Sequence, residues 1–170
     1  SSVQRVSDLK GSRVSYPAPT ALAAAIMPQW LMHTAGLDVM KDVAHVYVGS
    51  QESSIMSAAL GLTDAAATWP PPWRAFQQTH PELAANLRVL ATTPPLVNNS
   101  VMARHDVPAD TTERLVQVLT GLESTPEGLA ILLAMQTARF HPANDQSYAS
   151  VRAFVHDFEQ RVRPVESTRP

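Results

Sequence analysis

The chain has 170 residues, of which 45% are hydrophobic, and it carries a formal net charge of -2. A chain of this kind can bury a core in one domain or two small lobes, and it offers no basic surface that would make nucleic acid an expected partner. It contains no cysteine, which excludes thiol chemistry, disulfides and cysteine-based zinc sites.

The first part of the chain alternates short apolar runs with helical patterns. This alternation is typical of strand-helix-strand crossovers and therefore predicts an α/β fold with a mostly parallel sheet. The expected strands are residues 13–16, 43–48, 65–68, 87–92 and 101–104. Helices are expected over residues 20–35, with Thr20 as the cap and a kink at Pro28, and over residues 53–60 and 73–80.

From about residue 105 onward the patterns predict helices only. Asp110 is expected to cap the first of them, and its apolar stripe consists of Leu115, Val116, Val118, Leu119 and Leu122. Residues 124–127 have the spacing of a capping box that opens a helix over 128–139, and the last helix is expected over 148–162. The sequence thus predicts one α/β lobe followed by a helical segment that packs elsewhere.

Three loops follow expected strands at the carboxyl edge of the sheet, where open α/β sheets bind ligands. They are residues 16–24, 49–54 and 68–73. In the first loop, backbone N–H groups at a helix N-terminus could bind an anion, although the loop has almost no polar side chain. Each loop taken alone is explained equally well as an ordinary connection between a strand and a helix.

The sequence contains none of the common catalytic or metal-binding patterns. Its six histidines include no His-x-x-x-His pair, and there is no nucleophile elbow, dinucleotide fingerprint or phosphate-binding Gly-Lys-Ser/Thr loop. No acid–base pair stands out either. We therefore expect a protein that is not an enzyme and that uses no metal and no cofactor.

A series of short segments stands in a characteristic order along the chain. They are SDLKGSRV (7–14), the Pro-bearing turn and helix after it, GLD (36–38), GSQESS (49–54), ALGLTDAA (59–66), LRVL (87–90), VMARHDVP (101–108) and PEG (126–128). The order and spacing resemble the phosphate, phosphite and phosphonate solute-binding proteins of ABC importers. The likeness covers most of residues 5–160 and lies in the series rather than in any single motif.

This resemblance implies a type 2 periplasmic-binding-protein fold, in which two α/β lobes close on a ligand. Residues 1–97 would form the second lobe, and residues 98–170 would supply the crossing strand and C-terminal helices of an incomplete first lobe. The amino-terminal part of that first lobe has no counterpart in the chain. The apolar stripes of the later helices would then lack their usual sheet and could drive association into a homodimer.

The positions that bind ligand in the family are changed in this chain. The family's Ser- and Thr-rich opening loop falls on residues 20–24, where only Thr20 keeps a hydroxyl. Gln51, with Glu52 beside it, stands where the family often has a histidine. Asn99 falls near the position at which some members have a carboxylate that binds an amine of the ligand. Because each lost charged hydrogen bond costs roughly 1 to 3 kcal/mol, we expect an altered ligand.

Aromatic and amide side chains could replace the lost hydroxyls and form a flatter, more apolar pocket. The ligand would then be an oxyanion or a small organic molecule. The residues expected to bind it are Tyr16, Thr20, Ala21, Ser50, Gln51, Glu52, Trp69 and Asn99.

The resemblance favours an extracytoplasmic, periplasmic solute-binding protein that works with an ABC-transporter permease. Residues 1–12 lack the hydrophobic segment of a signal peptide, so we expect that signal to be missing from this chain. The alternative is the ligand-sensing domain of a membrane signalling protein, such as a histidine kinase or a cyclase. An enzyme on the same fold is the least favoured hypothesis, since no catalytic group is evident.

Overall fold

The computed structural model describes residues 3–165, which form two compact units. Within that range, unit 1 comprises residues 3–95 and 152–165, and unit 2 comprises Leu96–Val151. The first boundary lies close to the expected end of the α/β lobe at residue 97. Residues 152–165, however, pack with unit 1 rather than with the segment that precedes them. The assignment of 1–97 and 98–170 to two different lobes stays a prediction.

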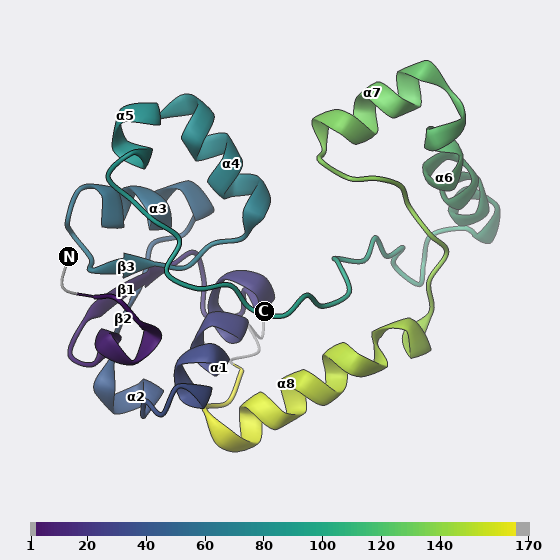
Figure 1. Cartoon of the computed structure of the whole chain (residues 1–170). Coiled ribbons are helices and arrows are strands. Elements are labelled where there is room, and N and C mark those ends of the chain that lie inside the picture. The colour runs from purple at the N-terminus through teal and green to yellow at the C-terminus, as the bar shows by residue number, and fades with distance from the viewer. Residues whose placement is uncertain (1–2, 166–170) are drawn as a thin grey trace. The chain divides into compact units, whose positions relative to one another are not determined.

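A small parallel sheet lies at the centre of unit 1 (Figure 1). Its strands are β1 (Arg13–Tyr16), β2 (Ala44–Tyr47) and β3 (Ala65–Ala66), in the spatial order β2-β1-β3. The central strand β1 pairs Val14 with His45 on one side and with Ala65 on the other. The expected α/β class is thereby confirmed, as are the first three strands, although β3 ends at Ala66 rather than at residue 68.

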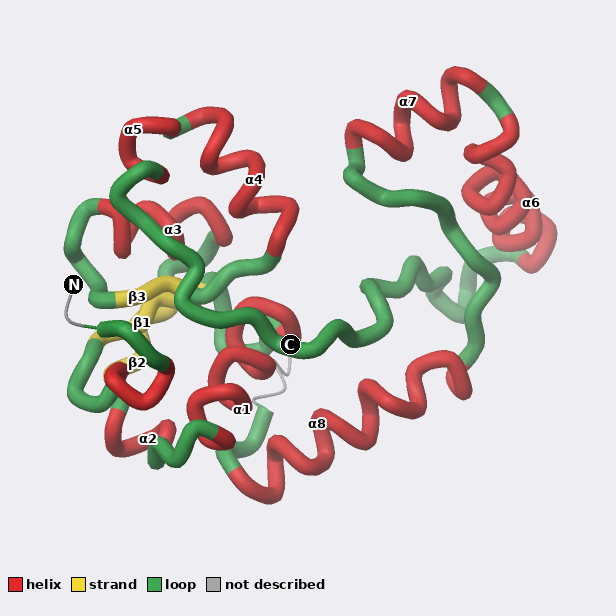
Figure 2. Tube along the Cα trace, viewed as in Figure 1, coloured by secondary structure: helices red, strands yellow, loops and turns green. Residues whose placement is uncertain are grey.

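Helices cover both faces of this sheet (Figure 1). One face carries α1 (Met27–Thr34) and α2 (Val39–Asp42), and the other carries α3 (Gln51–Ala59), α4 (Pro70–Thr79) and α5 (Pro81–Ala84). A 3-10 turn (Val6–Leu9) precedes β1, a π-helical turn (Leu22–Ile26) precedes α1, and α8 covers Ala149–Arg161. Between α5 and α6 (Ala109–Gly121) the chain runs as a long loop (Figure 2).

Buried apolar side chains of unit 1 form two clusters. The first joins β1 to α1 and α2, and its members on these elements include Val14, Tyr16, Met32 and Val39. The second joins α3, α4 and α5 through the buried side chains of Ile55, Phe76 and Ala84. The first cluster therefore packs α1 and α2 against β1, and the second packs α3, α4 and α5 against one another.

Buried hydroxyl groups attach α3 to the sheet. Ser15 Oγ on β1 donates to the Ser54 carbonyl at 2.8 Å and lies 3.1 Å from Thr63 Oγ1. Ser54 Oγ donates to the Ala67 carbonyl at 3.0 Å. Since buried polar groups must be hydrogen-bonded, these contacts set the position of α3 and therefore of the loop that leads into it.

Unit 2 is helical where it has regular structure. It contains α6 (Ala109–Gly121), a 3-10 turn (Leu122–Ser124), α7 (Pro126–Ala134) and a second 3-10 turn (Asp145–Tyr148). The apolar stripe expected on α6 is exposed at Leu115, Val116 and Val118, and the helix has no buried residue. Within residues 3–165, no helix combines the length and the apolar composition needed to span a membrane.

The helix ends in unit 2 differ from those expected. Pro108 rather than Asp110 precedes α6, and Asp110 lies in its first turn. Thr125 rather than Ser124 caps α7, because the Thr125 hydroxyl accepts the Gly128 N–H at 3.0 Å. The helix ends at Ala134, so the residues up to 139 that we expected in it are not helical.

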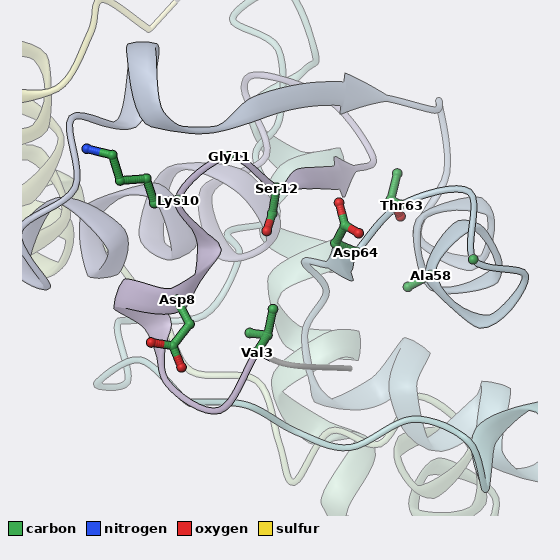
Figure 3. A pocket seen from close by; sticks show the side chains of 9 residues that line it. Val3, Asp8, Lys10, Gly11, Ser12, Ala58, Thr63 and Asp64 are labelled. Carbon is green, nitrogen blue, oxygen red and sulfur yellow. The ribbon is translucent and has the colours of Figure 1, made fainter.

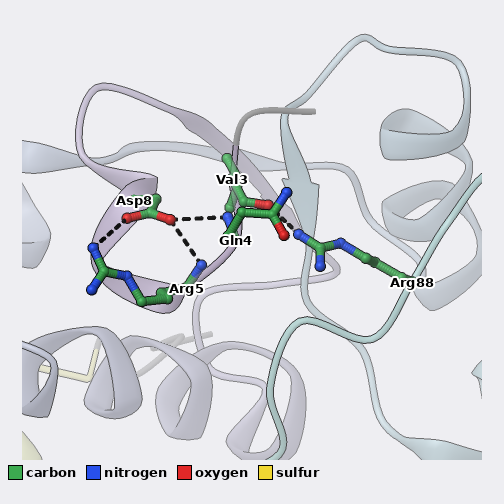
Figure 4. Close-up of polar contacts among 5 residues, drawn as sticks. All are labelled: Val3, Gln4, Arg5, Asp8 and Arg88. Atoms are coloured by element: carbon green, nitrogen blue, oxygen red, sulfur yellow. Dashed lines mark hydrogen bonds and ion pairs between the residues drawn. The ribbon is translucent and has the colours of Figure 1, made fainter.

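Two expected strands do not form. Residues 87–92 and 101–104 have no regular secondary structure, and neither segment pairs with the described sheet. A strand needs neighbours for its N–H and C=O groups, and an apolar run alone does not supply them. The segment after α5 is held instead by the Arg88 guanidinium, which donates to the Val3 carbonyl (Figure 4). The adjoining N–H groups of Gln4 and Arg5 donate to the Asp8 carboxylate.

The backbone of Gly128 makes a close approach in unit 2. A Cβ added there would lie 2.0 Å from the Leu122 carbonyl oxygen and 2.7 Å from its carbonyl carbon. We predict that Gly128→Ala lowers the free energy of unfolding by about 1–3 kcal/mol, because the backbone must shift to relieve the overlap. Urea unfolding followed by circular dichroism measures the change. Gly121→Ala is the matched control, since its Cβ meets nothing within 4 Å; equal losses in both variants would contradict the prediction.

Candidate functional site

The loops expected to bind ligand leave one edge of the sheet. The strands β1, β2 and β3 are parallel, so the segments that follow Tyr16, Tyr47 and Ala66 all start at their carboxyl ends. This edge is where open α/β sheets place their ligands. The structure therefore brings the three predicted loops to a common edge, as the order of strands and helices had indicated.

Hydrogen bonds join these loops to one another. The Gly49 N–H in the second loop donates to the Pro17 carbonyl in the first at 2.9 Å. The Thr68 hydroxyl in the third loop donates to Gln51 Oε1 in the second at 3.1 Å. The three loops are thus one connected structural feature rather than three separate turns.

The helix that follows the first loop begins in a π-helical register. The N–H groups of Ile26 and Met27 donate to the carbonyls of Ala21 and Leu22, five residues earlier in each case. Pro28 accounts for this register, because it has no N–H and its ring clashes with the carbonyl four residues earlier in an α-helix. The kink expected at Pro28 is therefore a change of helical register just before it.

Three consecutive backbone N–H groups at this helix start have no acceptor within the described chain. They belong to Leu22, Ala23 and Ala24, and no side chain caps the helix. Ala21 is the N-cap, so the expectation that Thr20 caps the helix is wrong; Thr20 is exposed. Unpaired N–H groups at a helix start carry partial positive charge and bind anions. The first loop can therefore hold an oxyanion through its backbone alone.

The second loop presents polar side chains from the start of α3. Ser50 caps this helix, since its Oγ accepts the Ser53 N–H at 3.0 Å. Gln51 uses its Oε1 to accept from Thr68, and its Nε2 has no partner within the described residues. Glu52 faces His80, with Oε1 3.3 Å from Nε2 of the imidazole. Gln51 thus keeps a side-chain N–H donor that has no partner among the described residues.

The remaining expected ligand residues lie in different environments. Tyr16 is fully buried and its hydroxyl donates to Met32 Sδ at 3.8 Å, so the expectation that it contacts ligand is corrected to a role in the core. Trp69 is half-buried and is the N-cap residue of α4. Asn99 is exposed in unit 2, where its N–H donates to Asn98 Oδ1 at 2.8 Å. Of these side chains, Trp69 is the one that adjoins the loops of unit 1.

A polar network beside the first loop was missed in the sequence. Gln29 on α1 is fully buried; its Oε1 accepts from Arg163 Nε at 2.8 Å, and its Nε2 lies 3.4 Å from His45 Nδ1 and 3.3 Å from Tyr47 Oη. The other ring nitrogen of His45 lies 2.9 Å from the Val39 carbonyl. A sequence signal existed, because Gln29 is the single polar residue in the run ALAAAIMPQWLM (21–32).

The contacts of His45 require one protonation state. The Val39 carbonyl can only accept, so Nε2 carries the hydrogen, and Nδ1 accepts from Gln29. Burial lowers the pKa of His45 below its ordinary value. The hydrogen bond to Val39 opposes this shift, and the nearby positive charge of Arg163 adds to it. Burial also raises the pKa of Tyr16, so its phenol stays protonated. The network is therefore built around a neutral imidazole.

A separate cavity of about 460 Å³ lies at the other edge of the sheet (Figure 3). Its lining includes Ser12 and Asp64, which directly precede β1 and β3. The Asp64 carboxylate accepts the Arg13 N–H at 2.7 Å, and Lys10, also in the lining, pairs with an aspartate outside it at 3.0 Å. The Lys10 charge is therefore already paired, and one oxygen of the Asp64 carboxylate is used by the backbone. Among the described residues, no three His, Asp or Glu side chains form a group that could hold a metal ion.

Comparison with protein families gives a match over most of the chain. Residues 1–148 match the family model described as ABC transporter, phosphonate, periplasmic substrate-binding protein. No curated protein gives a significant match to the chain.

Two solved structures share the fold. One is a binding protein component of an ABC phosphonate transporter from Pseudomonas aeruginosa, with a TM-score of 0.83 and 15% identity over 95% of this chain and 55% of that chain. The other is a Xanthomonas citri protein bound to a chloride ion, with a TM-score of 0.73 and 19% identity over 94% of this chain and 62% of that chain. The chain thus spans little more than half the length of either structure, and the likeness shows a shared fold.

The neutral imidazole of His45 makes stability depend on pH. Because its pKa is lower in the folded state than the ordinary value of 6.5, the unfolded chain takes up this proton first as the pH falls. We predict that the melting temperature falls as the pH is lowered through about 6.5 and below, and that His45→Gln reduces this fall. Thermal unfolding at pH 7 and pH 5 measures it. His156→Gln, at an exposed position of α8, is the control; an identical pH response in both variants would rule out His45 as the cause.

Proposed function

Because this chain belongs to the family of periplasmic substrate-binding proteins of phosphonate ABC transporters, we propose that it binds a small ligand outside the cytoplasm for delivery to an ABC-transporter permease. The family consists of binding proteins rather than enzymes. The observation that carries the binding role is the set of three unpaired N–H groups of Leu22, Ala23 and Ala24 at the carboxyl edge of the sheet.

The chemistry of this edge favours an anion as the ligand. The three N–H groups are donors at the positive end of a helix that continues from the π-helical turn through α1. Gln51 adds a free amide donor from the adjoining loop. The Xanthomonas citri relative, which was solved with a chloride ion, supports anion binding on this fold.

We further propose that the ligand differs from a phosphate-type dianion. The side chains that surround the free N–H groups, from Ala21 to Ala24, carry no hydroxyl, and the Thr20 hydroxyl does not cap the helix. Each charged hydrogen bond that is missing lowers affinity by about 1.5–3 kcal/mol. The half-buried Trp69 in the adjoining loop supplies apolar surface instead. These features favour a small organic oxyanion, such as a carboxylate with an apolar substituent.

The ligand-sensing domain of a signalling protein is the alternative role of the same fold. It would use the same three loops and would differ in the membrane partner that responds when the lobes close on the ligand. The match to the transporter family favours the permease as that partner.

Nuclear magnetic resonance tests the site directly. The ¹⁵N-labelled protein is titrated separately with acetate, benzoate, methylphosphonate and inorganic phosphate. We expect the backbone amide signals of Leu22, Ala23 and Ala24 to shift and saturate, with benzoate binding more tightly than phosphate. Micromolar binding of methylphosphonate would contradict the altered ligand, and unshifted signals with all four anions would contradict the site.

Leu22 allows one backbone donor to be removed with little disturbance. Proline is well tolerated at the first position of a helix, and Ala21 before it has ψ of 107°, which suits a residue that precedes proline. We predict that Leu22→Pro weakens binding of the best anion roughly ten- to a hundredfold, because about 1.5–3 kcal/mol of charged hydrogen bonding is lost. Isothermal titration calorimetry measures the affinity.

The matched control is Leu22→Ala, which shortens the same side chain but keeps the N–H group. It should bind the anion within about threefold of the unaltered protein, since this changes the binding free energy by less than 1 kcal/mol. If both variants lost affinity equally, the Leu22 side chain rather than its N–H would be responsible.

A further inference from the structure

Arg163, just beyond the end of α8, reaches back to the first loop. Its NH2 group donates to the Pro19 carbonyl at 2.7 Å, its Nε donates to Gln29 Oε1 at 2.8 Å, and its guanidinium lies 5.4 Å from the centre of the Phe158 ring. All these residues belong to unit 1. A single side chain therefore connects the C-terminal segment, helix α1 and the loop that precedes the free N–H groups.

The first loop depends on contacts from outside itself. Pro17 and Pro19 have no N–H, so the loop can build little hydrogen bonding of its own. The Pro17 carbonyl accepts from Gly49 on the next loop, and the Ala18 carbonyl accepts from Ala21. Of these three carbonyls, that of Pro19 stands last in the sequence before the helix start, and among the described residues its partner is Arg163.

The position of the Arg163 side chain is itself constrained by Gln29. The Nε2 group of Gln29 faces His45 and Tyr47, so its Oε1 is the atom left to accept from Arg163. If the amide turned over, Nε2 would face the Arg163 Nε–H so that two donors would meet, and His45 Nδ1 would lose the N–H group that donates to it. One arrangement thus satisfies all the buried groups, and it presents the guanidinium to Pro19.

The charge of Arg163 is not neutralised by a carboxylate in the described chain. Its hydrogen bonds there go to the Gln29 side chain and to the carbonyls of Pro19 and Pro164, all of which are neutral. A positive charge that contacts Pro19, and that no carboxylate of the described residues neutralises, makes the potential around the first loop more favourable for an anion.

We propose that Arg163 is a positioning residue of the anion site, which holds the Pro19 carbonyl so that the N–H groups of Leu22–Ala24 converge and which adds positive charge beside them. The proposal rests on the proposed function of the first loop. It assigns to the end of the chain a role in ligand binding, although 144 residues separate Arg163 from Pro19 in sequence.

Hydrogen exchange without ligand tests the positioning role separately from binding. The amides of Ala25, Ile26 and Met27 are hydrogen-bonded in the π-helical turn and report on its order. We expect Arg163→Gln to speed their exchange at least threefold while the amides of β1 keep their rates. Arg114→Gln, at an exposed position of α6, is the matched control and should leave both sets of rates unchanged.

Anion titrations with benzoate and inorganic phosphate complete the test. We expect Arg163→Gln to bind the tighter of these anions at least tenfold more weakly, and Arg163→Lys, which keeps the charge but not the fork of donors, to lie between that variant and the unaltered protein. Unchanged exchange of Ala25–Met27 in Arg163→Gln would overturn the proposal whatever the affinities are.

Other outcomes separate the two proposals. If neither anion binds the unaltered protein but exchange is faster in Arg163→Gln, the proposed function fails for these anions while the positioning role stands. If the β1 amides of Arg163→Gln also exchange faster, that variant has lost its fold. The exchange rates of Arg163→Lys then test the positioning role instead. Faster exchange confined to Ala25–Met27 in that variant supports the proposal, and unchanged exchange there overturns it.

Discussion

The buried amide of Gln29 is the interaction on which the candidate site depends. It is fully enclosed, and leaving one of its polar atoms unsatisfied would cost about 1–3 kcal/mol. Its partners come from β2 and from the C-terminal segment, so one side chain on α1 sets the tautomer of His45 and the direction of Arg163. Elements that lie far apart in the sequence are thereby held in a single arrangement beside the loop that carries the free N–H groups.

The change of register before Pro28 links this network to the helix start. An extra residue in one turn rotates every later side chain by about 100° relative to a continuous α-helix. The turn before Pro28 leaves backbone N–H groups without an acceptor among the described residues, while the segment after it buries Gln29. The change of register before Pro28 thus gives the start and the body of the helix different faces, and the body turns Gln29 into the core.

The sequence predicts those features that local pattern and topology determine. The strands β1 and β2 are short apolar runs bounded by turn residues, and the common edge of the three loops follows from parallel strand order. Residues 87–92 and 101–104 show the limit, because an apolar run does not reveal whether a neighbouring strand exists, and Val89 and Met102 are in fact 59% and 83% exposed. Arg163 could not be found in this way, since nothing in the local sequence indicates a contact with Pro19.

Recognition through backbone groups explains how a fold can keep a site while its side chains change. Any residue except proline supplies an N–H at a helix start, so the apolar side chains of Ala21 and Leu22 leave these donors in place. In the proposed site, the groups that could distinguish one anion from another lie beside the loop, and they include the amide of Gln51, the ring of Trp69 and the charge of Arg163. Such groups are supplied by other loops and by the end of the chain, so ligand preference can change while the strand-turn-helix itself stays the same.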